Sequence, residues 1–329
     1  MFVKKYLPGI LLSFGIAAVS IFLGSLLPLI GSSVLAIVLG IVLNNSMKLP
    51  AAFQEGLSYS GKKLLQYSII FLGFSMSIGQ VSETGLSSLR ISLITILIAF
   101  LAAYLVGRFF KMNRVLTILI GFGTAICGGS AIAAVAPVIG AKDRDVVISI
   151  ATIFLFNVLA VFIFPFLGHT WGMTDTGFGM WAGTAINDTS SVVAAGYAYS
   201  AEAGAYATIV KLTRTLMIVP VCLFFALMMM RGAQGSAAGF SLKRIFPMFV
   251  LYFIVACLIN TSGILPAAAA HTLGTLGKFA IVLAMSALGL NTDLAALLRN
   301  GLRPLALGMV CWIAVAGTSL LVQHALGLL

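Results

Sequence analysis

A carboxylate stands inside an apolar run in the segment GTAINDTSSVVAAG, residues 183–196, of a chain in which only 8% of residues are charged. An ionised carboxylate in a membrane costs several kcal/mol unless it is paired or hydrated, so we expect Asp188 to carry a coupling proton or sodium ion. Two alternatives stay open: Asp188 caps a helix at the membrane surface, or it pairs permanently with Lys211 or Arg214. The polar side chains expected to line a binding site here are Asn187, Asp188, Thr189, Ser190 and Ser191.

A related segment, GTAICGGSAIAAVA, occurs at residues 123–136. The run GFGTAICGGS (121–130) holds four glycines, each of which costs up to about 1 kcal/mol in a helix interior. A break there would leave unpaired amides that favour an anion, although small residues also permit close helix packing. The run lacks the Gly-Lys-Ser/Thr ending of a nucleotide-binding loop. The residues expected to contact a substrate are Cys127, Gly128, Gly129 and Ser130.

Two basic residues, Lys211 and Arg214, lie within an apolar segment rather than in a loop. They are three positions apart and therefore share a helix face. The guanidinium fork suits carboxylate, sulfate or sulfonate oxygens, and the lysine adds a second charge, so the pair is expected to bind an anion or to balance Asp188. Alternatively, both side chains reach out to the outer membrane surface. Asn157, a single amide in an apolar run, is expected to make an interhelical hydrogen bond rather than a ligand contact.

Composition indicates an all-α polytopic membrane protein, because 61% of the 329 residues are hydrophobic and long apolar runs alternate with short basic loops. Residues 1–329 are expected to form one transmembrane transporter domain, with no separate catalytic module and no enzymatic activity. The formal charge of +11 comes from scattered residues rather than from a patch, which argues against nucleic-acid binding. Four cysteines lie in apolar segments without CxxC spacing, so no metal site and no cofactor are expected.

Hydropathy predicts about eleven transmembrane helices. Most of the 19 Lys and Arg residues then fall on one side, which places the N-terminus in the cytoplasm. In this topology Lys62 and Lys63 are counted on the cytoplasmic side and Lys278 on the outer side. The predicted spans are 8–27, 31–45, 62–80, 88–107, 115–139, 146–168, 177–199, 205–230, 245–260, 275–291 and 303–325.

The sequence also repeats itself at an offset of 216 positions, at which NNSMKLPAA (44–52) matches NTSGILPAA (260–268). Copies at about 31–107 and 247–323 would be an odd number of spans apart, which predicts an inverted-topology repeat. The central segment, about 115–230, carries both GTAI segments as discontinuous helices. Those two segments obey a separate offset of 60, and the sequence leaves open whether they are a direct duplication or include a re-entrant segment.

Three blocks resemble the sulfate-exporter family, the YeiH-like bacterial inner-membrane proteins: GFGTAICGGSAIAAVAPVIGAKDRDV, GMWAGTAINDTSSVVAAGYAYSAEAGAYATIVKLTRTL and GLNTDLAALLRNGLRPL. The resemblance covers nearly the whole chain. It implies a secondary transporter, distantly related to inverted-repeat carriers such as sodium/proton antiporters and bile-acid transporters.

The expected function is secondary active transport of a small anion, a sulfate-like oxyanion or an organosulfonate, coupled to H⁺ or Na⁺ through Asp188. The expected location is the lipid bilayer of the bacterial inner membrane. Two alternatives remain, a cation/proton antiporter and an anion channel. The sequence leaves open the substrate, the direction of transport, the coupling ion and whether two copies form a homodimer.

Overall fold

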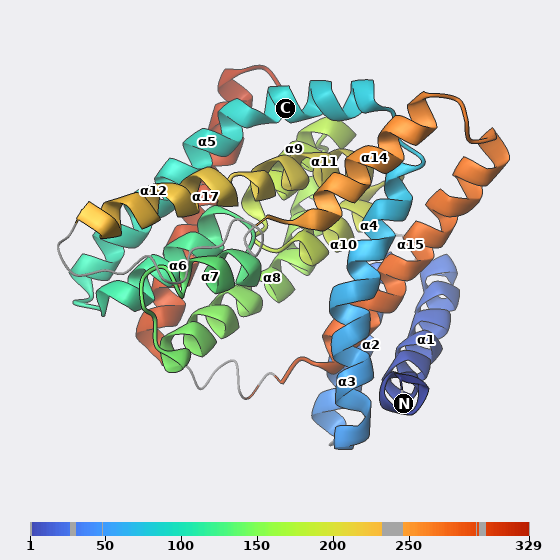
Figure 1. The fold of residues 1–329 in the computed structure, drawn as a ribbon, viewed down its shortest axis with the longest axis horizontal. Coiled ribbons are helices and arrows are strands. Elements are labelled where there is room, and N and C mark those ends of the chain that lie inside the picture. Colours follow the sequence, from blue (N-terminus) through green and yellow to red (C-terminus); the bar gives the residue numbers. More distant parts are fainter. Residues whose placement is uncertain are drawn as a thin grey trace. The chain divides into compact units, whose positions relative to one another are not determined.

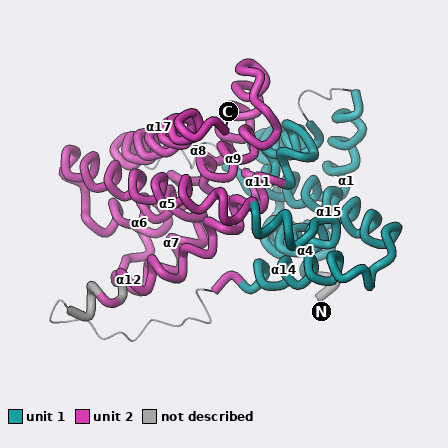
Figure 2. The backbone as a smooth tube through the Cα atoms, turned by 90° about the horizontal axis from the view of Figure 1, so that it is seen from above, with its two compact units in different colours: residues 1–83, 193–205, 248–296 teal, residues 84–192, 206–247, 297–329 magenta. Residues whose placement is uncertain are grey.

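The computed structural model describes residues 2–26, 31–47, 49–231, 246–293, 295 and 301–328, and these residues form helices and turns without strands (Figure 1). The described chain divides into two compact units, which Figure 2 shows in different colours. Unit 1 comprises residues 1–83, 193–205 and 248–296, and unit 2 comprises residues 84–192, 206–247 and 297–329. Residues 296–300, within the predicted second repeat copy, lie outside the described part of the chain.

Apolar helices dominate the described residues. Six are long and apolar enough to cross a membrane, and three shorter apolar helices accompany them. Large apolar side chains also point outward, for example Leu97, Leu101 and Leu105 on one helix face, as expected where lipid is the neighbour. The chain is therefore membrane-embedded, while the count of eleven spans stays a prediction. The six long segments are Lys5–Leu26, Ile78–Phe109, Asp143–Thr170, Ala201–Phe225, Ala267–Leu290 and Leu302–Ala325.

Unit 1 is a helical bundle in which α15 packs against α1, α2 and α4, while α14 packs against α4 and α1 against α3. Helices α2 and α15 approach closely where Gly40 faces Gly289, and a Cβ on Gly40 would lie 2.7 Å from the amide nitrogen of Leu290. The elements are α1 (Phe2–Leu26), α2 (Ser32–Ser46), α3 (Ala51–Tyr59), the π-helix η1 (Ser60–Leu64), α4 (Leu65–Gly73), α14 (Met248–Thr261) and α15 (Ala267–Leu290).

Replacing Gly289 with Ala is expected to destabilise unit 1 by about 1–3 kcal/mol, because the new methyl group would overlap the carbonyl oxygen of Ile37. The measurement is the thermal unfolding midpoint of the purified protein in detergent. Gly15→Ala is the matched control, since nothing lies within 4 Å of a Cβ there and alanine favours the helix. An equal midpoint for the two variants would contradict the close approach.

Three lysines that the sequence counted at the two membrane surfaces lie in the middle of helical stretches. Lys62 and Lys63 belong to η1, in the middle of the continuous helical stretch 51–73, and Lys278 lies near the centre of α15. The helical stretches that hold these lysines begin at Ala51 and Ala267, before the predicted spans 62–80 and 275–291, whose bounds in the membrane stay predictions. The reason is that hydropathy penalises the lysines, whereas the Ala-rich starts after Pro50 and Pro266 have high helix propensity.

Unit 2 surrounds the two GTAI segments. Helix α17 packs against α6, α8 and α9, and α8 packs against α6 and α7. Two hydrogen bonds fix α9 to α17: Trp181 Nε1 donates to Ala316 O at 3.1 Å, and the hydroxyls of Thr184 and Ser319 are 2.7 Å apart. The elements are α5 (Ile78–Phe109), α6 (Arg114–Ala125), α7 (Gly129–Val135), α8 (Asp143–Thr170), α9 (Asp175–Ala185), α10 (Thr189–Tyr199), α11 (Ala201–Leu216), α12 (Ile218–Arg231) and α17 (Leu302–Ala325), of which α5, α10 and α11 cross the unit boundary.

Candidate functional site

Both GTAI segments are interrupted helices. In the first, α6 ends at Ala125 and α7 begins at Gly129. Gly128 between them has φ 66° and ψ −130°, a backbone conformation that essentially only glycine adopts. In the second, α9 ends at Ala185 and Ile186 continues in an extended conformation, with φ −83° and ψ 132°.

The two interruptions meet inside unit 2. A Cβ atom placed on Gly128 would lie 3.4 Å from the Cβ of Asp188, which is ordinary van der Waals contact. The two interruptions therefore lie next to each other. Asn157 on α8 holds the second break in place, because its Oδ1 accepts the backbone N–H of Asp188 at 3.1 Å. The sequence identified Asn157 as an interhelical hydrogen-bonding residue, but its contact with Asp188 needed the tertiary structure. We call this arrangement the helix-break cluster: residues 124–130 and 186–191 with Asn157, Lys211 and Arg214.

Lys211 joins the ends of both broken helices. Its ammonium donates to Ile126 O at 2.8 Å and to Ile186 O at 2.9 Å, and the side chain is completely buried. The carbonyl groups at a helix C-terminus lack intrahelical donors and carry partial negative charge. A single cation therefore satisfies the negative ends of α6 and α9 together.

Arg214 binds the end of α6 alone. Its Nε donates to Ala125 O at 2.7 Å and its Nη2 to Thr124 O at 3.2 Å, while its buried Nη1 has no hydrogen-bond partner among the described residues. The alternative in which Lys211 and Arg214 reach the outer membrane surface is wrong, because both side chains are 0% exposed and point to backbone carbonyls within unit 2. The carbonyl groups at the ends of the broken helices accept hydrogen bonds from these cations and hold them inside the protein.

Asp188 forms the cap of α10. Its Oδ2 accepts the backbone N–H of Ser190 at 3.0 Å and also the Ser190 hydroxyl, while its carbonyl oxygen accepts the N–H of Val192 at 3.0 Å. The cap alternative is therefore right about the bonding. Asp188 itself is partly buried and the nearby Asn187 and Ser191 are each 1% exposed, so this cap lies inside unit 2. Asp188 and Lys211 interact through their charges without an ion pair within 4.0 Å, which contradicts a permanent direct salt bridge.

The remaining expected site residues fall into two groups. Cys127, Asn187, Thr189, Ser190 and Ser191 are buried in the helix-break cluster. Within the described part of the chain, neither Oδ1 nor Nδ2 of Asn187 has a hydrogen-bond partner. By contrast, Gly129 is only half-buried and Ser130 is exposed on the first turn of α7, so the structure does not bring Ser130 into the buried group.

Asn157→Leu is expected to destabilise the protein by about 1–3 kcal/mol, because the buried N–H of Asp188 would lose its acceptor. Leucine has the same branching as asparagine but two bulkier methyl groups, so part of the loss can come from packing. The measurement is the thermal unfolding midpoint, with wild type and variants at the same detergent concentration. Asn157→Asp keeps the acceptor oxygen and serves as the comparison; an unaltered midpoint in the leucine variant would show that the second break does not depend on this bond.

Comparison with known proteins finds matches along almost the full length. The family model described as Conserved hypothetical protein 698 matches residues 8–308. A UPF0324 membrane protein from Clostridium tetani is 42% identical over 342 residues, and one from Streptococcus pneumoniae is 45% identical over 340 residues; each match covers 99% of both chains. A solved sodium proton antiporter from Methanocaldococcus jannaschii aligns with 96% of this chain and 100% of its own at 14% identity, with a TM-score of 0.31, which does not establish a common fold.

Proposed function

The chain belongs to the family described as Conserved hypothetical protein 698, and from this premise we propose that it is a secondary active transporter of a small anion. The proposed substrate is a sulfate-like oxyanion or an organosulfonate, as the resemblance to the sulfate-exporter family implies. Transport is coupled to H⁺ or Na⁺ through Asp188 and requires no covalent chemistry. In this proposal the protein spans the bacterial inner membrane many times, with its N-terminus in the cytoplasm.

The observation that carries the anion proposal is a set of buried polar atoms without partners in the helix-break cluster. Arg214 Nη1 and the two amide atoms of Asn187 are buried and make no hydrogen bond. A buried donor left unsatisfied costs about 1–3 kcal/mol, and more when it is charged, so such atoms favour a bound solute. A guanidinium donor and an amide donor together suit the oxygens of an oxyanion.

Asp188 supplies the reason for coupling. An anion bound at Arg214 would add a second negative charge to the cluster that already holds the Asp188 carboxylate. Like charges that share a buried site repel, and a proton or sodium ion on Asp188 removes the repulsion. Binding of the solute and binding of the coupling ion therefore favour each other, which is the thermodynamic requirement for symport.

Symmetry within unit 1 supports the inverted-repeat part of the proposal. Asn44 Nδ2 donates to Thr292 O at 3.0 Å, and Asn260 Nδ2 donates to Met76 O at 3.2 Å. Adding the offset of 216 to residue 44 gives 260, and adding it to 76 gives 292, so the two bonds are the same contact with the copies exchanged. Such an exchange is the mark of two-fold symmetry, and transporters use repeated halves to open alternately to the two sides.

A cation/proton antiporter is the second candidate. It is favoured by the backbone contacts of Lys211 and Arg214, because those cations already satisfy helix ends and leave Asp188 as the carboxylate able to exchange ions. In this case a cation would replace the anion at the helix-break cluster. An anion channel would use the same buried donors, but its anion flux would rise with concentration without saturating.

The experiment is uptake of radiolabelled sulfate and labelled methanesulfonate into proteoliposomes. Saturable uptake that responds to an imposed pH or sodium gradient is expected. Uptake proportional to concentration would identify a channel. Sodium-dependent movement of protons without anion uptake would identify the antiporter and overturn the anion proposal.

A further inference from the structure

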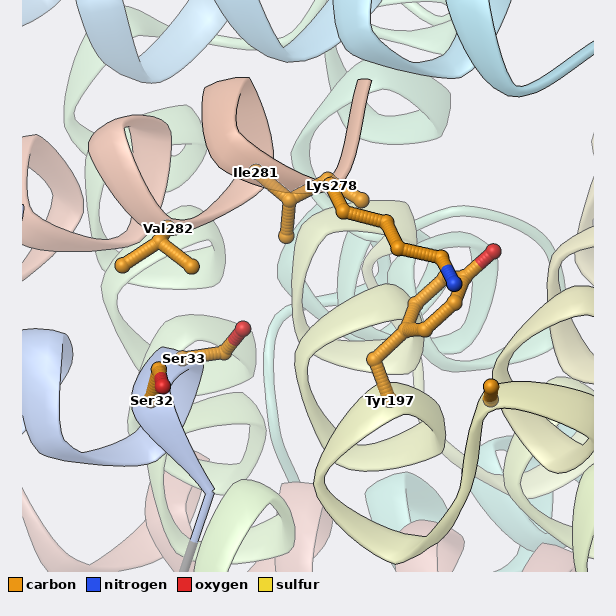
Figure 3. Close-up of a pocket in the computed structure, with 7 residues that line it drawn as sticks. Ser32, Ser33, Tyr197, Lys278, Ile281 and Val282 are labelled. Carbon is orange, nitrogen blue, oxygen red and sulfur yellow. The ribbon is translucent and has the colours of Figure 1, made fainter. Parts of the chain in front are cut away.

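A partly open cavity is lined by residues of unit 1, none of which belongs to the helix-break cluster. Its volume is about 230 Å³, far more than the roughly 10–15 Å³ that one water molecule needs on the same measure. Figure 3 shows the lining side chains, which come from the start of α2, the end of α10, the start of α11 and the middle of α15. They are Ser32, Ser33, Tyr197, Ala201, Lys278, Ile281 and Val282.

The cavity has a cation with no carboxylate partner. Lys278 lies near the middle of α15, a helix long and apolar enough to cross the membrane, where charged side chains are rare and face cavities or partners. Its ammonium lies 5.8 Å from the centroid of the Tyr197 ring, and none of the described carboxylates forms an ion pair with it. The close-up shows the Lys278 side chain extended across that ring (Figure 3).

Hydrogen-bond donors face the same space. The first backbone bond of α2 is from Leu35 N to Gly31 O, and Gly31 offers no side-chain cap, so the preceding amides of the first turn have no partner among the described residues. Ser33 is only 6% exposed, and its side chain points into the cavity (Figure 3). Its hydroxyl forms no hydrogen bond with any described residue. An unpaired helix N-terminus, a buried hydroxyl and a cation all favour an anionic group.

The α15 face beside Lys278 is apolar. Ile281 and Val282 on α15 line it, and Ala201 adds a small side chain at the start of α11. A bare inorganic anion would leave this wall without contacts. We propose that the cavity between Ser33, Tyr197 and Lys278 binds a small organic anion, with its carboxylate or sulfonate toward Lys278 and the first turn of α2 and its short apolar chain against Ile281 and Val282. This binding site does not depend on the transport function of the helix-break cluster.

The test is thermal unfolding of the full-length protein in detergent, titrated with 1-butanesulfonate. A saturable rise of the midpoint is expected by mass action, whereas sodium sulfate and 1-butanol, which carry only the charge or only the chain, should give a much weaker rise. Lys278→Met is expected to weaken the apparent affinity by about tenfold or more, and Ser33→Ala by about threefold. Lys62→Met is the matched control, because Lys62 occupies the position 216 residues earlier, is exposed as Lys278 is, and is not among the described lining residues, so it should bind like wild type.

Two further variants keep the test decisive if Lys278→Met folds poorly. Lys278→Arg keeps the charge and should retain binding, while Ala201→Phe fills the cavity and should remove it without altering Lys278. No rise with 1-butanesulfonate, or unchanged binding in both Lys278→Met and Ala201→Phe, would overturn the proposal. The proposal would also be overturned if phosphatidylglycerol raised the midpoint in the same way and competed with 1-butanesulfonate, because the occupant would then be a lipid.

Asp188→Asn separates this site from the proposed transport site. The variant should still bind 1-butanesulfonate, even though its transport is expected to fail. Loss of binding in Asp188→Asn would place the ligand at the helix-break cluster and contradict a separate site in unit 1. Conversely, binding that survives in a protein that transports no anion would leave this proposal standing and reject only the transport function.

Discussion

Asp188→Asn is expected to lower ion-coupled anion uptake by about 100-fold, which corresponds to the roughly 3 kcal/mol that a buried charge-assisted interaction contributes. Asparagine keeps the shape of the side chain and an oxygen that can accept the Ser190 N–H at the start of α10, so the helix cap should survive. What disappears is the ionisable carboxylate that takes up H⁺ or Na⁺. Uptake of labelled sulfate or methanesulfonate into proteoliposomes under a pH or sodium gradient measures the effect.

The control for Asp188→Asn is Asp143→Asn, an exposed carboxylate in the first turn of α8, which should transport like wild type. The thermal unfolding midpoint of Asp188→Asn should lie within a few degrees of the wild-type value, which shows that lost transport does not come from lost folding. If Asp188→Asn still accumulates anion against its gradient, Asp188 is a structural cap and the coupling role assigned to it is wrong.

Lys211→Met is expected to have the largest effect on stability, about 3–5 kcal/mol of unfolding free energy. The ammonium satisfies Ile126 O and Ile186 O at once, and methionine fills a similar volume without donating to either. Two buried carbonyl groups would lose their donor, and the charge of Asp188 would lose a nearby opposite charge. The measurement is equilibrium or thermal unfolding in detergent, followed by the helical circular-dichroism signal.

Lys63→Met tests whether the effect depends on burial. Lys63 is exposed in η1, so its replacement should change the unfolding free energy by no more than about 0.5 kcal/mol. Lys211→Arg keeps the charge but demands more room at a completely buried site, and should fall between the two. A Lys211→Met protein as stable as Lys63→Met would mean that the ends of α6 and α9 do not need this cation.

The sequence anticipated much of the helix-break cluster because its signals are local. Hydropathy over a window of residues reports membrane embedding, and the glycines around Gly128 report a backbone that cannot remain helical. Charge in an apolar run singles out Asp188, Lys211 and Arg214 without any knowledge of their neighbours. The repeat at an offset of 216 positions can also be read from the sequence. The hydrogen bonds of Asn44 and Asn260, which occupy equivalent positions at this offset, are consistent with it.

The tertiary structure decided which groups these charges meet. Lys211 bonds carbonyls that are 85 and 25 residues away along the chain, and Asn157 accepts an amide 31 residues away. Such partners depend on how distant helices pack, whereas hydropathy and helix propensity describe each segment alone. The same limit applies to Lys278: hydropathy placed it near one end of a predicted span, and only the packing of α2, α10 and α15 puts that charge beside a cavity.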